Sequence, residues 1–338
     1  MITLKLDLKS DYEKGTDVAA KLLKEGKTVA IPTETVYGLA ASAFDDEAIK
    51  NVFIAKGRPQ DNPLIVHICD EAMLKRIAKN IPDRALECAE KFWPGPFTMV
   101  LEKTGETAKS VSAGLNTVAV RMPSNKTALD IIRKSGLALA APSANSSGSP
   151  SPTKPCHVEA DLDGKIDAIV FGENCEVGVE STVVSFCTNP PRLLRPGAVT
   201  EKQLRELIPD LEVDKAVLAS LDKDEIAHSP GMKYKHYAPK AEAYLVEGDS
   251  GEFCEFVNSK KQAVAVCFEE DKNISINKIV YGNQKDESSL AKEVFAALRE
   301  VDELGVKTAY IHAPSKNGIG LAVYNRLLRA TAFKVIKL

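Results

Sequence analysis

The sequence predicts an α/β protein of two domains joined by a linker. A chain of 338 residues is longer than most single domains, and its hydrophobic fraction of 44% can fill two cores. The first two hundred residues mix short β-rich runs with helical patterns, whereas strands and helices alternate regularly after residue 240. We therefore predict a first domain over residues 1–208, a linker over 209–240 and a second domain over 241–338.

The first domain is predicted to contain a sheet with helices packed against it. Its loops are rich in Gly, Pro, Ser and Thr, and the longest, residues 141–153, cannot be helical. Long polar loops on a rigid scaffold are common places for binding sites. The predicted strands are Thr28–Pro32, Leu64–Cys69, Phe97–Leu101, Val118–Arg121, Ala168–Phe171 and Ser181–Phe186, and the clearest helices are Asp17–Glu25, Lys126–Ser135 and Thr200–Ile208.

The predicted linker ends in an unusual basic segment. Residues 229–240 read SPGMKYKHYAPK, with three Lys, one His and two Tyr but no acidic residue. A simple spacer does not need this composition. Two interpretations stay open: a segment that folds across the mouth of a binding site and excludes water, or a tether.

The second domain is predicted to be a small Rossmann-like α/β unit. Strand patterns at 243–248, 263–268, 278–282, 308–314 and 334–338 are separated in part by helical patterns at 251–260, 288–305 and 321–332. Crossover helices between strands indicate a mostly parallel sheet. No G-x-G-x-x-G follows a strand here, so nothing indicates dinucleotide binding.

Composition excludes several classes of protein. A formal net charge of −3 and a pI near 6.1 argue against non-specific coating of nucleic acid, which depends on many Lys and Arg. The N-terminal residues carry charges and no apolar signal region, and no run of about 18 apolar residues occurs. The seven cysteines form no C-x-x-C pair, which indicates reduced thiols in a cytoplasmic protein without a zinc ribbon.

Six short motifs are candidates for chemistry. Lys56 and Arg58 flank Gly57, and in an extended segment both cations would lie on one side and suit a phosphate chain. Arg121 ends a strand before Pro123, where a guanidinium can clamp a carboxylate. Taken singly, each also fits a solvated turn or a capped strand end. The six motifs are PTETVYGL (32–39), AKGRP (55–59), TVAVRMP (117–123), APSAN (141–145), VESTV (179–183) and LRPG (194–197).

Together and in this order, these motifs resemble the YrdC-like family, and within it the long threonylcarbamoyl-AMP synthases with an added C-terminal domain. The K-x-R and S-x-N signatures of that family stand as Lys56-Gly57-Arg58 and Ser143-Ala144-Asn145. The segment SPGMKYKHYAP, which short members lack, is also present. The resemblance spans essentially the whole chain.

The resemblance implies a YrdC-like twisted mixed sheet around a large basic cavity. It also implies a reaction in which L-threonine, bicarbonate or CO2, and ATP with Mg2+ give L-threonylcarbamoyl-AMP and pyrophosphate. A partner transferase complex would then complete N6-threonylcarbamoyladenosine in tRNA. The protein itself would make at most a weak contact with tRNA.

The resemblance also assigns roles to individual residues. The cations of the K-x-R signature, Lys56 and Arg58, are expected to be catalytic. Threonine is expected to contact Thr35, His67, Arg121, Ala141 and Ser181. ATP is expected to contact Arg58, Asn62, Thr117, Ser143, Asn145, Ser151, Arg195, Tyr234 and His236, with Lys235 nearby, while Mg2+ is expected to arrive on the ATP phosphates, its protein ligands unassigned.

Three questions stay open at this point. His67 is either a base or a passive hydrogen-bonding group. A double-stranded RNA or tRNA binding module is an alternative of a different class, against which the acidic balance argues. A carbamoyl transfer enzyme of hydrogenase maturation shares the YrdC-like domain, but it would carry cysteine-rich zinc modules that this chain lacks.

Overall fold

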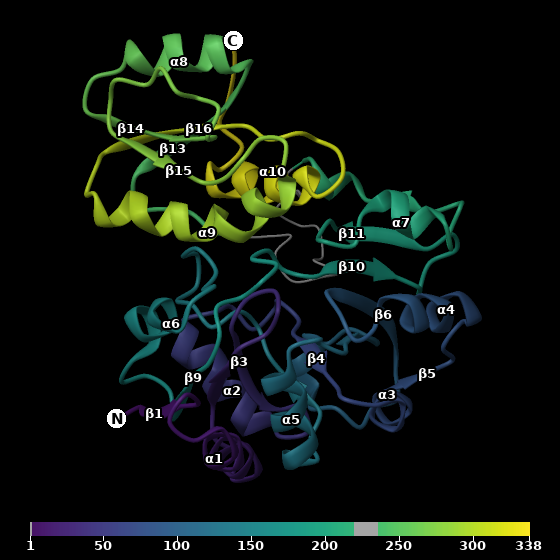
Figure 1. The fold of residues 1–338 in the computed structure, drawn as a ribbon. Helices are drawn as coiled ribbons and strands as arrows, with labels where there is room; N and C mark the ends of the chain where they lie inside the picture. Colours follow the sequence, from purple (N-terminus) through teal and green to yellow (C-terminus); the bar gives the residue numbers. More distant parts are fainter. Residues whose placement is uncertain (1, 220–235) are drawn as a thin grey trace.

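The computed structural model describes residues 2–219 and 236–338. Two α/β units lie one above the other, with the N-terminus in the lower unit and the C-terminus at the far end of the upper one (Figure 1). The lower unit is built on a twelve-stranded sheet and the upper unit on a five-stranded sheet. The predicted two-domain α/β architecture is therefore confirmed.

The large sheet is mixed. Its strand order is β1-β9-β2-β3-β8-β4-β7-β6-β10-β11-β12, with β5 paired to β6. Neighbours β4 and β7 are parallel, whereas β7 and β6 are antiparallel. The strands are β1 (Leu4–Asp7), β2 (Val29–Ile31), β3 (Gly38–Ser42), β4 (Ile65–His67), β5 (Ala78–Lys79), β6 (Phe97–Lys103), β7 (Thr117–Arg121), β8 (Leu139–Ala140), β9 (Ala168–Phe171), β10 (Thr182–Ser185), β11 (Arg192–Arg195) and β12 (Glu212–Val213).

Side-chain caps and glycines set the ends of the helices around this sheet. Asp45 accepts hydrogen bonds from the first turn of α2, and Gly57 ends that helix with a φ of +62°. In α5, the Asn125 side chain caps the first turn and the left-handed Gly136 ends the helix. The helices are α1 (Tyr12–Lys24), α2 (Asp46–Lys56), α3 (Glu71–Ile77), α4 (Asp83–Phe92), α5 (Lys126–Ser135), α6 (Pro155–Leu162) and α7 (Glu201–Arg205), with 3₁₀ turns η1 (Lys109–Ser112) and η2 (Lys215–Val217).

The first part of the predicted linker belongs to the large sheet. β12 pairs in parallel with β11, and Arg192 forms an ion pair with Glu212 across the pair at 2.8 Å. Leu211 and Val217 are buried on either side of β12. Regular structure therefore continues beyond residue 209, where the sequence predicts loss of periodicity.

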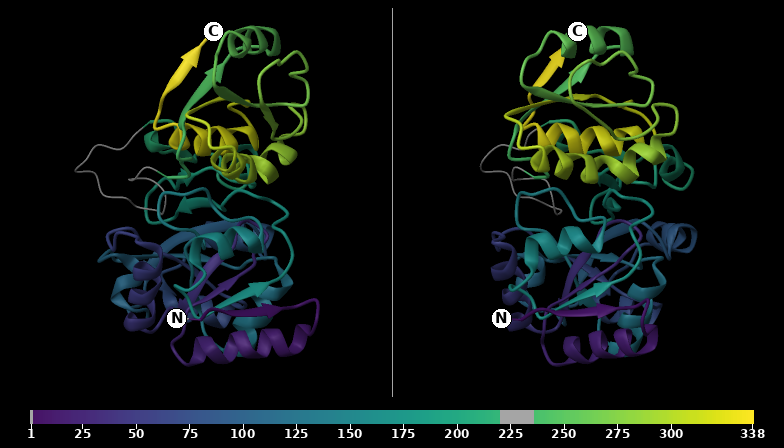
Figure 2. Two further views of the ribbon diagram at one scale, coloured as in Figure 1. Left: turned by 90° about the vertical axis from the view of Figure 1, so that its left-hand side faces the viewer. Right: turned by 60° about the vertical axis from the view of Figure 1, so that its left-hand side comes forward.

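The smaller sheet is entirely parallel, as its strand and helix alternation predicts. Its order is β15-β14-β16-β13-β17. Helices α9 and α10 form the face of this unit that is turned toward the first domain, and α8 covers the opposite face (Figures 1 and 2). The elements are β13 (Glu242–Glu247), α8 (Ser250–Asn258), β14 (Ala263–Cys267), β15 (Lys278–Val280), α9 (Glu287–Glu303), β16 (Thr308–His312), α10 (Gly320–Ala330) and β17 (Val335–Lys337).

Candidate active site

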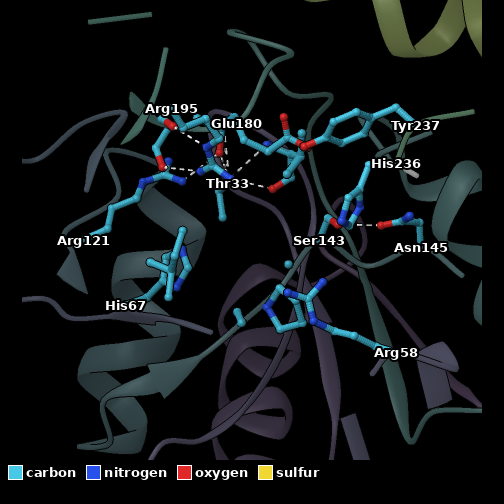
Figure 3. Close-up of a pocket in the computed structure, with 17 residues that line it drawn as sticks. Thr33, Arg58, His67, Arg121, Ser143, Asn145, Glu180, Arg195, His236 and Tyr237 are labelled. Atoms are coloured by element: carbon cyan, nitrogen blue, oxygen red, sulfur yellow. Dashed lines mark hydrogen bonds between the residues drawn. The ribbon is translucent and has the colours of Figure 1, made fainter. Parts of the chain in front are cut away.

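A pocket opens where the motifs of the first domain meet (Figure 3). It contains guanidinium, imidazole and hydroxyl groups from segments far apart in the chain. Many of the residues singled out by sequence come together here. Those that line the pocket are Thr35, Arg58, His67, Arg121, Ala141, Ser143, Asn145, Ser181, Arg195 and His236.

Strand register explains why these motifs meet. β4 and β7 run parallel, so that His67 and Arg121 are partners at their carboxyl ends. β6 runs against β7 and places Thr98 beside Arg121, while β10 runs with β6 and begins one residue after Ser181. The carboxyl ends of β4 and β7 therefore meet the amino ends of β6 and β10. The Thr98 and Ser181 hydroxyls lie 2.7 Å apart at this point.

Arg121 forms a buried ion pair with an acidic residue that sequence reasoning did not assign to the site. Its Nη2 lies 2.6 Å from Oε1 of Glu34, with both side chains at most 6% exposed. Nη1 donates to Thr35 Oγ1 at 2.8 Å, and Nε donates to the Gly95 carbonyl at 3.3 Å. Burial alone would raise the pKa of Glu34, but the charge of Arg121, its hydrogen bond and backbone hydrogen bonds together outweigh burial and lower that pKa. The guanidinium is thus held in a fixed orientation.

His67 is a neutral imidazole at physiological pH. Burial, followed by the nearby charge of Arg121, lowers its pKa to about 3. Its Nδ1 is buried and makes no hydrogen bond to the described protein atoms. An unpaired buried nitrogen of this kind is suited to hydrogen-bond a ligand in the pocket.

Lys56 holds the loop that carries Ser143 and Asn145, instead of facing the pocket beside Arg58. Its Nζ donates to the carbonyl oxygens of both loop residues. Burial, followed by the charge of Arg58, lowers the pKa of Lys56 well below its usual range. The expectation of an extended segment was wrong, because Lys56 ends α2 and Gly57 adopts a left-handed conformation. Arg58 alone of this pair lines the pocket.

Glu180 lies at the centre of a second charged cluster. Its Oε1 accepts a hydrogen bond of 2.6 Å from Ser151, and its Oε2 accepts one of 2.8 Å from Arg326 of α10. Burial alone would raise the pKa of Glu180, but Arg326 and then Arg195 lower it. Arg195 itself donates to the Ser181 carbonyl at 3.0 Å and to the Ser181 hydroxyl at 3.1 Å.

The end of the predicted linker reaches the pocket. His236 and Tyr237 both line it, and the Tyr237 ring packs 5.0 Å from Phe295 of α9. Burial, followed by the charge of Arg58, lowers the pKa of His236 to about 3. The next residue, Ala238, donates its backbone N–H to the Gly148 carbonyl in the serine-rich loop. Tyr234 and Lys235 lie outside the described residues.

Not every predicted residue reaches the pocket. Thr117 begins β7, whereas Arg121 ends it, so the length of the extended strand separates Thr117 from Arg121 by roughly 13 Å. Asn62 and Ser151 are buried but do not line the pocket surface, and Ser151 instead supports Glu180. Sequence reasoning missed the pocket residues Thr33, Glu180 and Tyr237, although each stands within or beside a motif.

The search for other sites gives two findings. Among residues 2–219 and 236–338, no three His, Cys, Asp or Glu side chains are grouped as a metal site. No helix in the same two ranges has both the length and the apolar character that a bilayer crossing requires.

Comparison with known proteins agrees with this architecture. A family model described as "Telomere recombination" matches residues 21–197, and one described as "Threonylcarbamoyl-AMP synthase, C-terminal domain" matches residues 199–332. The threonylcarbamoyl-AMP synthase of Pyrococcus abyssi is 42% identical over 329 residues, covering 95% of each chain. That of Bacillus subtilis is 43% identical, covering 94% of this chain and 93% of its own.

A solved structure shares the whole fold. The crystal structure of Pyrococcus abyssi Sua5 complexed with L-threonine superposes with a TM-score of 0.90 at 40% identity, and the match covers 100% of both chains. With two family models and near full-length relatives in agreement, the chain belongs to the threonylcarbamoyl-AMP synthases, in the long form that joins a YrdC-like domain to the C-terminal domain of that family.

Proposed function

We propose that this pocket binds L-threonine beside ATP, so that the enzyme makes L-threonylcarbamoyl-AMP and pyrophosphate from L-threonine, bicarbonate or CO2, and ATP. The observation that carries the proposal is the convergence of Arg58, Arg121 and Arg195 on one pocket. Both substrates are anions, and three guanidinium groups around one hollow can neutralise them together. We take this pocket to be the basic cavity that the family resemblance implies.

The threonine half lies around Arg121. Its guanidinium, already oriented by Glu34, would bind the amino acid carboxylate. The hydroxyls of Thr35 and Ser181 and the backbone at Ala141 would contact the rest of the amino acid, and neutral His67 would serve as a hydrogen-bonding group. A pKa of about 3 makes His67 a weak base at neutral pH, which supports the passive role.

The nucleotide half lies between Arg58 and Arg195, with the Ser143–Asn145 loop beneath it. Lys56 would act by fixing that loop, because its ammonium group binds the loop carbonyls. Both carboxylates near the pocket, Glu34 and Glu180, are held by arginines. We therefore propose that Mg2+ enters as part of the MgATP substrate.

The reaction then requires the enzyme to align the two substrates, and it requires no nucleophile from the protein. The threonine amine adds to CO2 and loses a proton, which gives a carbamate. A carbamate oxygen attacks the α-phosphorus, and the bond to the leaving pyrophosphate breaks. Arginines beside both anions lower their mutual repulsion, and His236 and Tyr237 would exclude water from the labile product.

The product would be consumed by a transferase complex that modifies tRNA, as the first step toward N6-threonylcarbamoyladenosine. Its site of synthesis would be the cytoplasm, which agrees with the presence of all seven cysteines as free thiols. A weak contact with tRNA stays part of the proposal.

One incubation tests the central proposal. Pure protein is mixed with MgATP, labelled bicarbonate and one amino acid at a time, and the products are separated. We expect a labelled adenylate and pyrophosphate with threonine, and neither when ATP is omitted. Absence of the adenylate would refute the proposal, and strong, steeply salt-dependent binding of tRNA without ATP would then favour an RNA-binding module.

A further inference from the structure

A fully buried arginine of the C-terminal domain is bonded directly to the first domain. Arg326 lies in α10 and has 0% exposure. Its Nε donates to Glu180 Oε2 at 2.8 Å, and its Nη2 donates to the Glu180 carbonyl at 3.2 Å. Its Nη1 donates to the Pro196 carbonyl at 2.9 Å and to Asn325 Oδ1 at 3.0 Å. One guanidinium therefore binds two separate segments of the first domain.

Both of these segments carry pocket residues. Glu180 and Ser181 come directly before β10, and Pro196 follows Arg195 at the end of β11. β10 and β11 are antiparallel neighbours, so these two ends lie together beneath α10 (Figure 1). Gly197 packs so closely on this junction that an added Cβ would lie 2.4 Å from the Thr182 nitrogen. A shift of the Arg326 guanidinium would therefore be transmitted to Ser181 and Arg195.

The cluster of Glu180, Arg195 and Arg326 contains one carboxylate and two guanidinium groups. Glu180 lines the pocket between two guanidinium groups, those of Arg195 and Arg326. Arg326, which does not line the pocket, neutralises Glu180 through its Oε2, and Arg195 is bonded to Ser181. Without Arg326, a buried carboxylate would have Arg195 as its remaining strong cation, and the two would be drawn together.

We infer that Arg326 is a positioning residue for the nucleotide half of the pocket, acting through Glu180 on Arg195. The inference rests on the proposed function, because it takes Arg195 as an ATP contact. It assigns the C-terminal domain a part in the site. That domain would supply the charge that orients a phosphate-binding arginine of the first domain.

A second contact between the domains points the same way. Arg299 of α9 binds both carboxylate oxygens of Asp161, at 2.9 and 3.1 Å, and also donates to the Pro150 carbonyl. Asp161 in turn accepts from the Ser146 N–H at 3.1 Å. The serine-rich loop next to the pocket is thus held by a C-terminal arginine as well.

Steady-state kinetics of full-length variants test the inference. Arg326→Lys keeps the charge but loses the planar fork, and we expect KM for ATP to rise roughly tenfold to hundredfold, as for loss of a hydrogen bond to a charged group. KM for threonine should change much less. The matched control is Arg329→Lys on the same helix, since Arg329 also binds the first domain, but through the Ala216 carbonyl and not through Glu180 or Pro196.

The double variant separates positioning from general stability. In a Glu180→Gln background, Arg326→Lys should add little further to KM for ATP, because its route of action is already removed. Threonine binding by calorimetry confirms in each variant that the pocket is folded. Equal losses for ATP and threonine, or a KM for ATP unchanged from the parent protein, would overturn the inference. Failure of the parent protein itself to use ATP would instead contradict the proposed function.

A pH profile gives an independent readout. The groups facing Glu180 are Arg326 of α10, Arg195 of β11, and His236 and Tyr237 of the linker end. In Arg326→Met the lowering effect of Arg326 on the pKa of Glu180 is lost, so protonation should begin at higher pH. We expect KM for ATP in this variant to vary with pH on the acid side more than in the parent protein. Parallel profiles would overturn the inference.

Discussion

The two halves of the pocket are built differently. On the threonine side, the contacts of Arg121 with Glu34, Thr35 and Gly95 all come from the first domain. On the nucleotide side, Glu180 is bonded to Arg326, which lies 146 residues further along the chain. Under the proposed assignment of the two halves, the first domain forms the amino acid side by itself, whereas the phosphate side depends on a charge from the other domain.

The largest effect should come from removing the second domain. A chain ending at residue 219 lacks the linker end, Arg299 and Arg326, and we expect it to lose synthesis of threonylcarbamoyl-AMP by roughly 10³-fold or more. The first domain keeps its own apolar cores, so it should remain folded and still bind threonine. Calorimetry and pyrophosphate release measure the two properties. Synthesis at the full-length rate would contradict both the closing role of the linker and the divided site.

The next largest effect should come from the threonine side. Arg121→Ala leaves Glu34 buried without its cation, and losing one partner of such a pair costs about 2–5 kcal/mol. We expect KM for threonine to rise roughly 30-fold to 4 × 10³-fold, and KM for ATP to rise much less. Glu34→Gln serves as the control that keeps the guanidinium. If ATP were affected more than threonine, the two halves would have to be exchanged.

Arg58→Ala should have a smaller but clear effect on turnover. This half-buried arginine lines the pocket and is not part of an apolar core, so the fold should survive. We expect kcat to fall roughly tenfold to hundredfold, since an electrostatic contact to the phosphates is lost. Thermal unfolding of the same variant is the control. Undiminished turnover would remove Arg58 from the site.

The smallest effect concerns stability as a function of pH. His67 has a folded pKa of about 3, below its unfolded value of 6.5, so the unfolded chain binds more protons between these values. Its contribution should therefore lower the free energy of unfolding as pH falls below 6.5, by about 1.4 kcal/mol per pH unit within the window. His67→Gln should reduce this slope by that amount in urea titrations. An unchanged slope would mean that His67 is protonated in the folded protein.

Much of the fold followed from local pattern. The predicted strand Ala168–Phe171 and the predicted helix Lys126–Ser135 match the structure residue for residue, because apolar periodicity and clear end signals coincide there. The helix predicted at Asp17 begins five residues earlier, at Tyr12, where Asp11 caps it. β12 was not predicted, because a two-residue edge strand has no periodicity to detect.

The site was harder to predict where the direction of a side chain decides whether it reaches the pocket. Sequence spacing placed Lys56 beside Arg58, but a left-handed Gly57 sends the two side chains to different partners. It also grouped Thr117 with Arg121, although only the carboxyl end of β7 reaches the pocket. Arg326 could not be assigned from sequence, because only the structure shows that every position of α10 is buried and that this arginine must therefore have a partner.

The 146-residue separation between Glu180 and Arg326 has a consequence for protein synthesis. A nascent chain that has emerged through β11 already contains every contact described for Arg121, so the proposed threonine side would be complete while translation continues. It lacks the guanidinium that completes the phosphate side until α10 has left the ribosome and docked. On the proposed assignment, ATP would be consumed only after both domains have been synthesised and have assembled.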